Sequence, residues 1–148
     1  LKHLLLRADH EIKIVTPYLD NVIMDRFENE LEMLGKRGVK IKLIFRDYNP
    51  QTQNLIHALK LMFEDNFEWR RISTPRVEGV SWQSARGVHA KFIVIDKKCA
   101  LVTSMNLTVN SMNYNIEIGV LVSIPRVLEQ IDEIFNILWV SSRPRTQS

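Results

Sequence analysis

The sequence contains only one cysteine, Cys99, so no disulfide can form within the chain. This thiol lies in an apolar run, which predicts a buried and unreactive side chain. No run of about 20 apolar residues is present, and this excludes a membrane-spanning helix. The apolar run at residues 4–6 is too short for a signal peptide, which favours an intracellular location without fixing one.

The excess of positive charge is small. The chain has 148 residues with 20 Lys and Arg against 17 Asp and Glu, a net charge of +3. That charge suits a polyanionic partner, and it suits an ordinary soluble surface equally well. The length predicts a single catalytic domain over residues 1–148. Because the chain has no initial methionine and starts in a helical pattern, we expect a mature form or a domain excised from a larger protein.

Alternating apolar patterns predict a mixed sheet. Strands are expected over residues 11–15, 39–45, 67–72, 88–95, 99–103 and 114–122. Helical periodicity predicts the end of a helix over 1–9 and helices over 21–36, around 55–63 and from Pro125 onward. Loops are expected over 73–87 and 104–113, with a tight turn at 96–98. Strands that alternate with helices and end in a hairpin indicate an α/β protein.

The residues with the clearest chemical meaning are His89 and Lys91, which lie two apart in a predicted strand and so share a face. An imidazole beside a fixed ammonium can attack a phosphate and hold it. Ser104 and Asn106, again two apart, can add a hydroxyl and an amide to the same pocket. Together they predict a phosphate-handling site.

The full pattern is H-x-K-x4-D-x6-T-S-x-N, in which the aspartate is Asp96 and the threonine is Thr103. It resembles the HKD motif of the phospholipase D superfamily, H-x-K-x4-D-x6-G-S-x-N, and departs from it only where Thr103 replaces glycine. The resemblance implies an α/β sandwich with a mixed sheet flanked by helices. It also implies a largely structural role for Asp96. Because glycine allows a closer backbone approach than a β-branched residue, Thr103 could tilt Ser104 and Asn106.

The resemblance assigns a role to each polar side chain. His89 would form a phosphohistidine, while Lys91 and Asn106 would bind the non-bridging phosphate oxygens and Ser104 would support them. Glu117 matches the acidic residue that follows the motif in many relatives. It would hydrogen-bond the far ring nitrogen of His89 and so fix the tautomer.

One motif supplies one histidine, whereas displacement at a phosphodiester also needs a general acid for the leaving oxygen. Members of the family bring two motifs together, either in one long chain or across a two-fold dimer. We therefore expect a homodimer with His89 of each subunit at a shared site. No His, Cys or carboxylate set has metal-ligand spacing, and no cofactor is expected.

Short members with a single motif resemble endonucleases, which makes DNA the expected partner. Arg76, Trp82 and Arg86 are candidate substrate-binding residues, because cations can follow a phosphate backbone and an indole can stack on an unpaired base. The further cations Arg70, Arg71, Lys97 and Lys98 flank the motif in sequence. Two alternatives remain open, a lipid phosphodiesterase and a non-catalytic domain that binds nucleic acid or dimerises.

Overall fold

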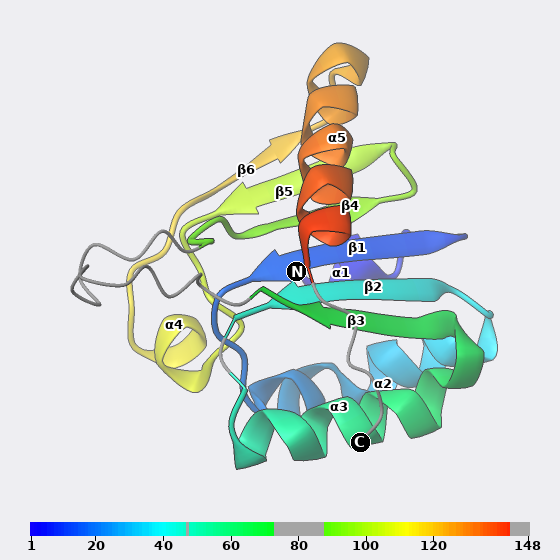
Figure 1. Ribbon diagram of the computed structural model, residues 1–148, viewed down its shortest axis with the longest axis vertical. Coiled ribbons are helices and arrows are strands. Elements are labelled where there is room, and N and C mark those ends of the chain that lie inside the picture. Colours follow the sequence, from blue (N-terminus) through cyan, green and yellow to red (C-terminus); the bar gives the residue numbers. More distant parts are fainter. Residues whose placement is uncertain (47, 73–87, 143–148) are drawn as a thin grey trace.

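The computed structural model describes residues 1–46, 48–72 and 88–142, and six strands within them form one mixed sheet (Figure 1). The strands are β1 (Glu11–Thr16), β2 (Lys40–Phe45), β3 (Phe67–Arg71), β4 (Phe92–Ile95), β5 (Cys99–Thr103) and β6 (Gly119–Val122). Their order across the sheet is β3-β2-β1-β4-β5-β6. The first three are parallel, and β4, β5 and β6 each run antiparallel to the strand before them in this order. This confirms the predicted α/β class.

Helices cover both faces of the sheet, as Figure 1 shows. The helices are α1 (Lys2–Leu5), α2 (Val22–Lys36), α3 (Pro50–Phe63), α4 (Val109–Asn113) and α5 (Pro125–Ser141), with a 3-10 turn at Glu64–Asn66. The larger core lies between the sheet and α2 and α3, and a smaller core lies under α5. The capping box of Asn49 and Thr52 begins α3, with Pro50 in its first turn.

The sequence located most elements correctly and misplaced the start of two strands. The fourth strand was expected from residue 88 but begins at Phe92, and the sixth was expected from residue 114 but begins at Gly119. The segment 104–113 was expected to be a loop, yet α4 forms at its end, where the Thr108 side chain accepts a hydrogen bond from the Ser111 N–H. The initial helix extends only over four residues. Local hydrophobic patterns do not predict where these elements begin and end, because the neighbouring elements that they pair with determine those positions.

Asp96 fixes the β4–β5 hairpin against the beginning of β1. Its carboxylate accepts hydrogen bonds from the backbone N–H groups of Asp9, His10 and Glu11, at 2.7, 2.9 and 2.7 Å. Asp96 and Lys97 both have positive φ, 50° and 54°, which is costly for residues other than glycine. Burial raises the pKa of Asp96, but the three N–H donors outweigh it and hold that pKa below its usual 3.8. The structural role expected for Asp96 follows from these contacts.

A buried ion pair attaches α5 to the other face of the sheet. Lys13 of β1 and Asp132 of α5 are each 5% exposed, and Lys13 Nζ donates to Asp132 Oδ1. Lys97 Nζ lies 3.2 Å from the second carboxylate oxygen, and the Lys13 ammonium lies 5.2 Å from the centroid of the Phe135 ring. Burial raises the pKa of Asp132, but its hydrogen bond from Lys13, together with Lys97, keeps it below the usual 3.8.

Replacing Asp132 with alanine should destabilise the fold by about 3 kcal/mol, because Lys13 would remain buried with only its longer, 3.6 Å contact to Glu11. The folded-state pKa of Asp132 lies below its unfolded value, so this contribution is complete above pH 3.8 and is lost as the pH falls through the folded pKa. Urea unfolding at neutral and acidic pH measures both effects. The control is Glu133→Ala, which removes an exposed carboxylate of the same helix. Equal unfolding midpoints for the two variants at neutral pH would contradict the assignment.

Candidate active site

His89 and Lys91 lie at the end of the sheet where β1 finishes, together with Ser104 and Asn106, which follow β5. Asp96 lies at the opposite end, against the beginning of β1. His89 and Lys91 precede β4, and the Lys91 carbonyl still accepts from the Thr103 N–H at 3.1 Å. Lys91 Nζ lies 3.0 Å from His89 Nε2 and donates to the His89 carbonyl at 3.0 Å. The structure therefore brings these two side chains together although neither belongs to a strand.

The Lys91–His89 contact constrains the state of the imidazole. An ammonium only donates, so in this contact Nε2 is the acceptor and its lone pair points at Lys91 Nζ. His89 is exposed, whereas Lys91 is buried. Burial lowers the pKa of Lys91 below 10.5, the Glu117 carboxylate raises it, and the Arg46 guanidinium lowers it. The site thus places an exposed imidazole beside a buried lysine.

Ser104 and Glu117 form the second part of the site. Ser104 Oγ donates to Glu117 Oε2 and accepts from the Ile118 N–H at 3.1 Å. Asn115 Nδ2 donates to the other Glu117 oxygen at 3.4 Å. The hydrogen bond from Ser104 is the main reason that the pKa of Glu117 lies below its usual 4.5. Among the described residues, Glu117 hydrogen-bonds Ser104 and Asn115, and its hydrogen bond to the His89 ring stays a prediction.

Asn106 is held by its backbone. Its N–H donates to Ser111 Oγ at 3.2 Å, and the next residue, Leu107, pairs with Leu19 beyond the end of β1. Asn106 Oδ1 is buried without a hydrogen-bond partner among the described residues. A buried unpaired amide oxygen is costly, which is a common property of binding sites that a ligand completes.

Thr103, the departure from the family pattern, is accommodated by the strand beside it. Its Oγ1 donates to the Ile118 carbonyl at 3.0 Å and accepts from the Met105 N–H at 3.1 Å. The residue opposite Thr103 on β6 is Gly119, and a Cβ placed on Gly119 would lie 3.4 Å from Thr103 Oγ1 and 3.0 Å from Leu101 Cδ1. A glycine therefore stands across from the threonine, and the backbone of Ser104 keeps its hydrogen bond to Ile118, at 2.9 Å.

The structure separates the cations that the sequence grouped around the motif. Arg76, Trp82 and Arg86 lie outside the described residues. Lys97 and Lys98 occupy the turn at the far end of β4 and pair with Asp132 and Asp9. The four residues of β4 separate them from Lys91, so they flank the motif in sequence but lie at the other end of the strand.

Sequence reasoning missed Arg46, which follows β2 at the carboxyl end and acts on Lys91. Its guanidinium lies 4.6 Å from the centroid of the Tyr18 ring. The available signal was its position immediately after a buried strand, since the ends of parallel strands converge.

Among the described residues, no group of three or more His, Cys, Asp or Glu could hold a metal ion. No helix in that part of the chain is long and apolar enough to cross a membrane.

Comparison with known proteins identifies the family. Residues 1–139 match the family described as cardiolipin synthase, PLD-like domain. The chain therefore belongs to the phospholipase D superfamily, which confirms the resemblance seen in the motif. The DISARM protein DrmC of Bacillus paralicheniformis is 32% identical over 118 residues, which are 78% of this chain and 45% of that protein. The chain thus spans about half the length of this curated relative.

Solved structures share the fold. NucT from Helicobacter pylori aligns with a TM-score of 0.79 at 16% identity, covering 97% of this chain and 87% of NucT. Nuc from Salmonella typhimurium, a phospholipase D family member, gives 0.69 at 19% identity, with 99% and 91% covered. The archaeal chromatin protein TrmBL2, whose structure shows a mode of DNA binding, gives 0.63 at 19% identity, with 97% and 48% covered. These likenesses confirm the phospholipase D-like architecture.

Replacing Thr103 with glycine should leave the rate of phosphodiester cleavage unchanged and lower stability by about 1 kcal/mol. The reasons are the loss of the hydroxyl hydrogen bonds and the backbone entropy of glycine in a strand. Urea unfolding and hydrolysis of bis-p-nitrophenyl phosphate measure the two quantities. Thr103→Ser, which keeps the hydroxyl, is the matched control. A rate that rises with glycine would show instead that the threonine distorts the pocket.

Proposed function

We propose that this domain is a metal-independent phosphodiesterase, an endonuclease that cuts DNA through a phosphohistidine at a site shared by two subunits. The observation that carries the proposal is the 3.0 Å contact between Lys91 Nζ and His89 Nε2. It places an imidazole beside a buried cation, and these two groups suit attack on phosphorus and charge stabilisation without a metal. NucT and Nuc, similar in fold, and the DNA-binding protein TrmBL2 make nucleic acid the favoured substrate.

In the proposed reaction, Lys91 Nζ first turns from His89 Nε2 to a non-bridging phosphate oxygen, which frees the Nε2 lone pair. Nε2 then attacks phosphorus, and the bond to the leaving oxygen breaks. Lys91 and Asn106 stabilise the non-bridging oxygens, whose charge grows in the transition state. The leaving oxygen takes a proton from a second histidine, which then removes a proton from the water that cleaves the phosphohistidine. Glu117, ionised at neutral pH, stabilises the cationic groups beside it and holds Ser104 in place.

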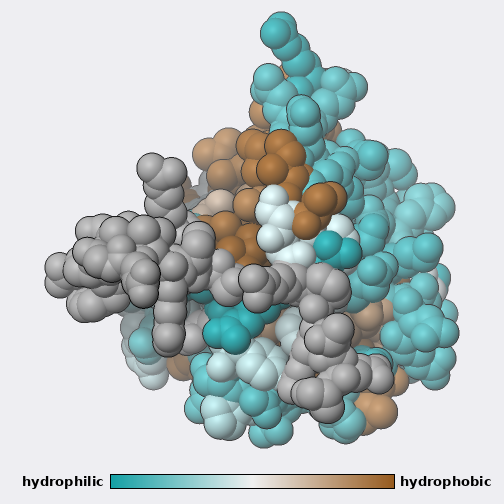
Figure 2. Space-filling model, in the orientation of Figure 1, coloured by the Kyte–Doolittle hydropathy of each residue, from teal (hydrophilic) through white to brown (hydrophobic). Residues whose placement is uncertain are grey.

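The second histidine is proposed to come from another copy of this domain. The site borders an exposed apolar surface, defined here as Val102, Ile118, Val120, Ile134 and Ile137 on β5, β6, α5 and the segment before β6. Ile118, Val120 and Ile137 are 76%, 60% and 58% exposed. Figure 2 shows apolar side chains gathered over α5 and β6. Ile118 belongs both to this surface and, through its backbone, to the contacts of Ser104, so pairing across the surface would bring two sites together.

The alternative functions make different demands. A lipid phosphodiesterase would need an apolar or basic surface that docks on a membrane. The exposed apolar surface could serve that purpose only if it were not covered by a second subunit. A non-catalytic domain would bind nucleic acid without turnover.

Replacing His89 with alanine should reduce cleavage by roughly 10³-fold or more, as expected for loss of a covalent nucleophile, while folding and DNA binding stay nearly intact. Plasmid and single-stranded DNA cleavage, measured with and without EDTA, tests nucleophile and metal independence together. The matched control is His3→Ala, which removes an exposed histidine of α1. Loss of activity in EDTA with recovery on adding a divalent ion would refute the mechanism, and a fully active His89→Ala would refute the nucleophile.

The parent domain should sediment as a two-fold dimer at micromolar concentration, and Val120→Glu should yield folded monomers without activity, because a charge cannot be buried unpaired at the interface. Leu61→Glu is the matched control, since Leu61 is 69% exposed on α3 and lies outside the apolar surface. It should remain dimeric and active. A parent that is strictly monomeric and still turns over phosphodiesters would rule out the shared site.

A further inference from the structure

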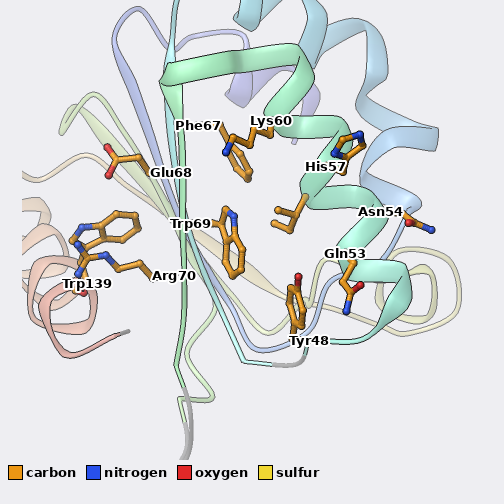
Figure 3. Close-up of a pocket in the computed structure, with 11 residues that line it drawn as sticks. Tyr48, Gln53, Asn54, His57, Lys60, Phe67, Glu68, Trp69, Arg70 and Trp139 are labelled. Carbon is orange, nitrogen blue, oxygen red and sulfur yellow. Dashed lines mark hydrogen bonds between the residues drawn. The ribbon is translucent and has the colours of Figure 1, made fainter. Parts of the chain in front are cut away.

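A pocket of about 580 Å³ lies beside the free edge of the sheet, lined by β3, α3 and the segment between β2 and α3 (Figure 3). Among the described strands, β3 pairs only with β2, and its other side borders the pocket. Phe67 and Trp69, two apart on β3, line it from the strand, and exposed polar residues of α3 line it opposite, among them His57 and Lys60. The size is that of a small-molecule or nucleobase site.

The wall of this pocket is a rigid aromatic stack. The rings of Tyr48 and Trp69 lie 5.6 Å apart between centroids with an interplanar angle of 12°. Phe45, which is buried, contacts both, at 6.1 Å from Tyr48 and 5.4 Å from Trp69. Trp69 itself is only half-buried. Half-exposed rings held from behind are suited to stacking against a planar ligand.

Cations surround the stack. The Arg71 guanidinium lies 6.0 Å from the centroid of the Tyr48 ring. Lys60 is exposed and forms no ion pair within the described part of the chain. The only carboxylate that lines the pocket is that of Glu68, on the face of β3 opposite to Trp69, as far as the described residues show. The pocket therefore combines a planar apolar surface with positive charge, which favours an aromatic anion.

Basic side chains lead from the pocket toward the residues of the motif. Arg71 Nε donates to the Arg46 carbonyl at 3.2 Å. Arg46 in turn is near enough to Lys91 to affect its charge state. Arg46 and Tyr48 follow β2 directly, at the same end of the sheet as the motif. A polyanion held at Lys91 could thus continue past two guanidinium groups to the aromatic stack.

We propose that this pocket is a base-binding subsite for single-stranded nucleic acid, in which an unpaired base stacks on Trp69 and Tyr48 while Arg46, Arg71 and Lys60 hold the adjoining phosphates. The subsite rests on the proposed nuclease function and specifies its substrate as a strand with unpaired bases. Duplex DNA keeps its bases stacked within the helix and cannot offer one to the pocket without the cost of flipping it out.

Binding is measured rather than cleavage, in the His89→Ala background, so that no oligonucleotide is cut. The probes are fluorescently labelled oligothymidine and an abasic oligomer of the same length and charge. The parent background should bind oligothymidine roughly five-fold or more tightly than the abasic probe, as expected for stacking of one base. Trp69→Leu, which keeps apolar packing but removes the π face, should abolish that preference, and Trp69→Phe should retain it.

Lys60→Ala provides a second test that does not disturb the core. It should weaken binding of both probes and reduce the salt dependence by about one phosphate contact, while Lys40→Ala, an exposed cation at the opposite end of β2, should change neither. Equal affinities of the parent for the two probes, or an unchanged preference in Trp69→Leu, would overturn the subsite and leave the pocket to another ligand class, such as an extended peptide added to β3.

The experiments distinguish failure of the proposed phosphodiesterase function from failure of the base-binding subsite. If the parent does not hydrolyse bis-p-nitrophenyl phosphate, yet loses its base preference in Trp69→Leu, the domain binds single strands without cutting them and the subsite stands. If the parent hydrolyses this small substrate but shows no base preference, the phosphodiesterase stands and the subsite is refuted.

Discussion

The Asp96 carboxylate, which accepts hydrogen bonds from three successive backbone N–H groups, sets the geometry on which the site depends. By joining the end of β4 to the chain just before β1, it fixes the antiparallel register in which Ile95 lies beside Ile12. Because β4 has only four residues, His89 and Lys91 must then emerge beside the carboxyl end of β1. A slip by one residue would turn Lys91 to the opposite face. Asp96 thus contributes to the site by fixing the register of β4, which positions His89 and Lys91, and not by contacting them.

The site is assembled from segments that come from both halves of the sheet, and it is open on one side. Lys91 is buried against the sheet while His89 remains exposed, and Ser104 and Glu117 belong to the segments that lead out of β5 and into β6. Those same segments continue into the apolar surface around Ile118. On the other side, Arg46 continues the positive charge toward the aromatic stack at the edge of the sheet. A site built at this junction can be completed by a partner on one side and extended by a substrate on the other.

Much of the fold followed from pattern alone. The strands β1, β2 and β5 and the helices α2, α3 and α5 form where periodicity predicted them, because each has one apolar face and a polar boundary. The misplaced starts of β4 and β6 have a common cause. The residues just before these strands have the residue pattern of a strand, but they lie outside the hydrogen-bonded strand pairing. Where that pairing begins depends on the neighbouring strand, which the local sequence does not specify.

The sequence by itself determined the family: the spacing of His89, Lys91, Ser104 and Asn106 identifies it and predicts a phosphate site, since side-chain type and period are local properties. Only the tertiary structure decided which groups surround them. In the structure Glu117 hydrogen-bonds Ser104, and Gly119 lies opposite Thr103. Lys97 and Lys98 lie at the far end of β4, where they pair with Asp132 and Asp9. The Arg46 guanidinium lowers the pKa of Lys91. These pairings join residues far apart in the chain, and their distances depend on strand order and register, which no local pattern encodes.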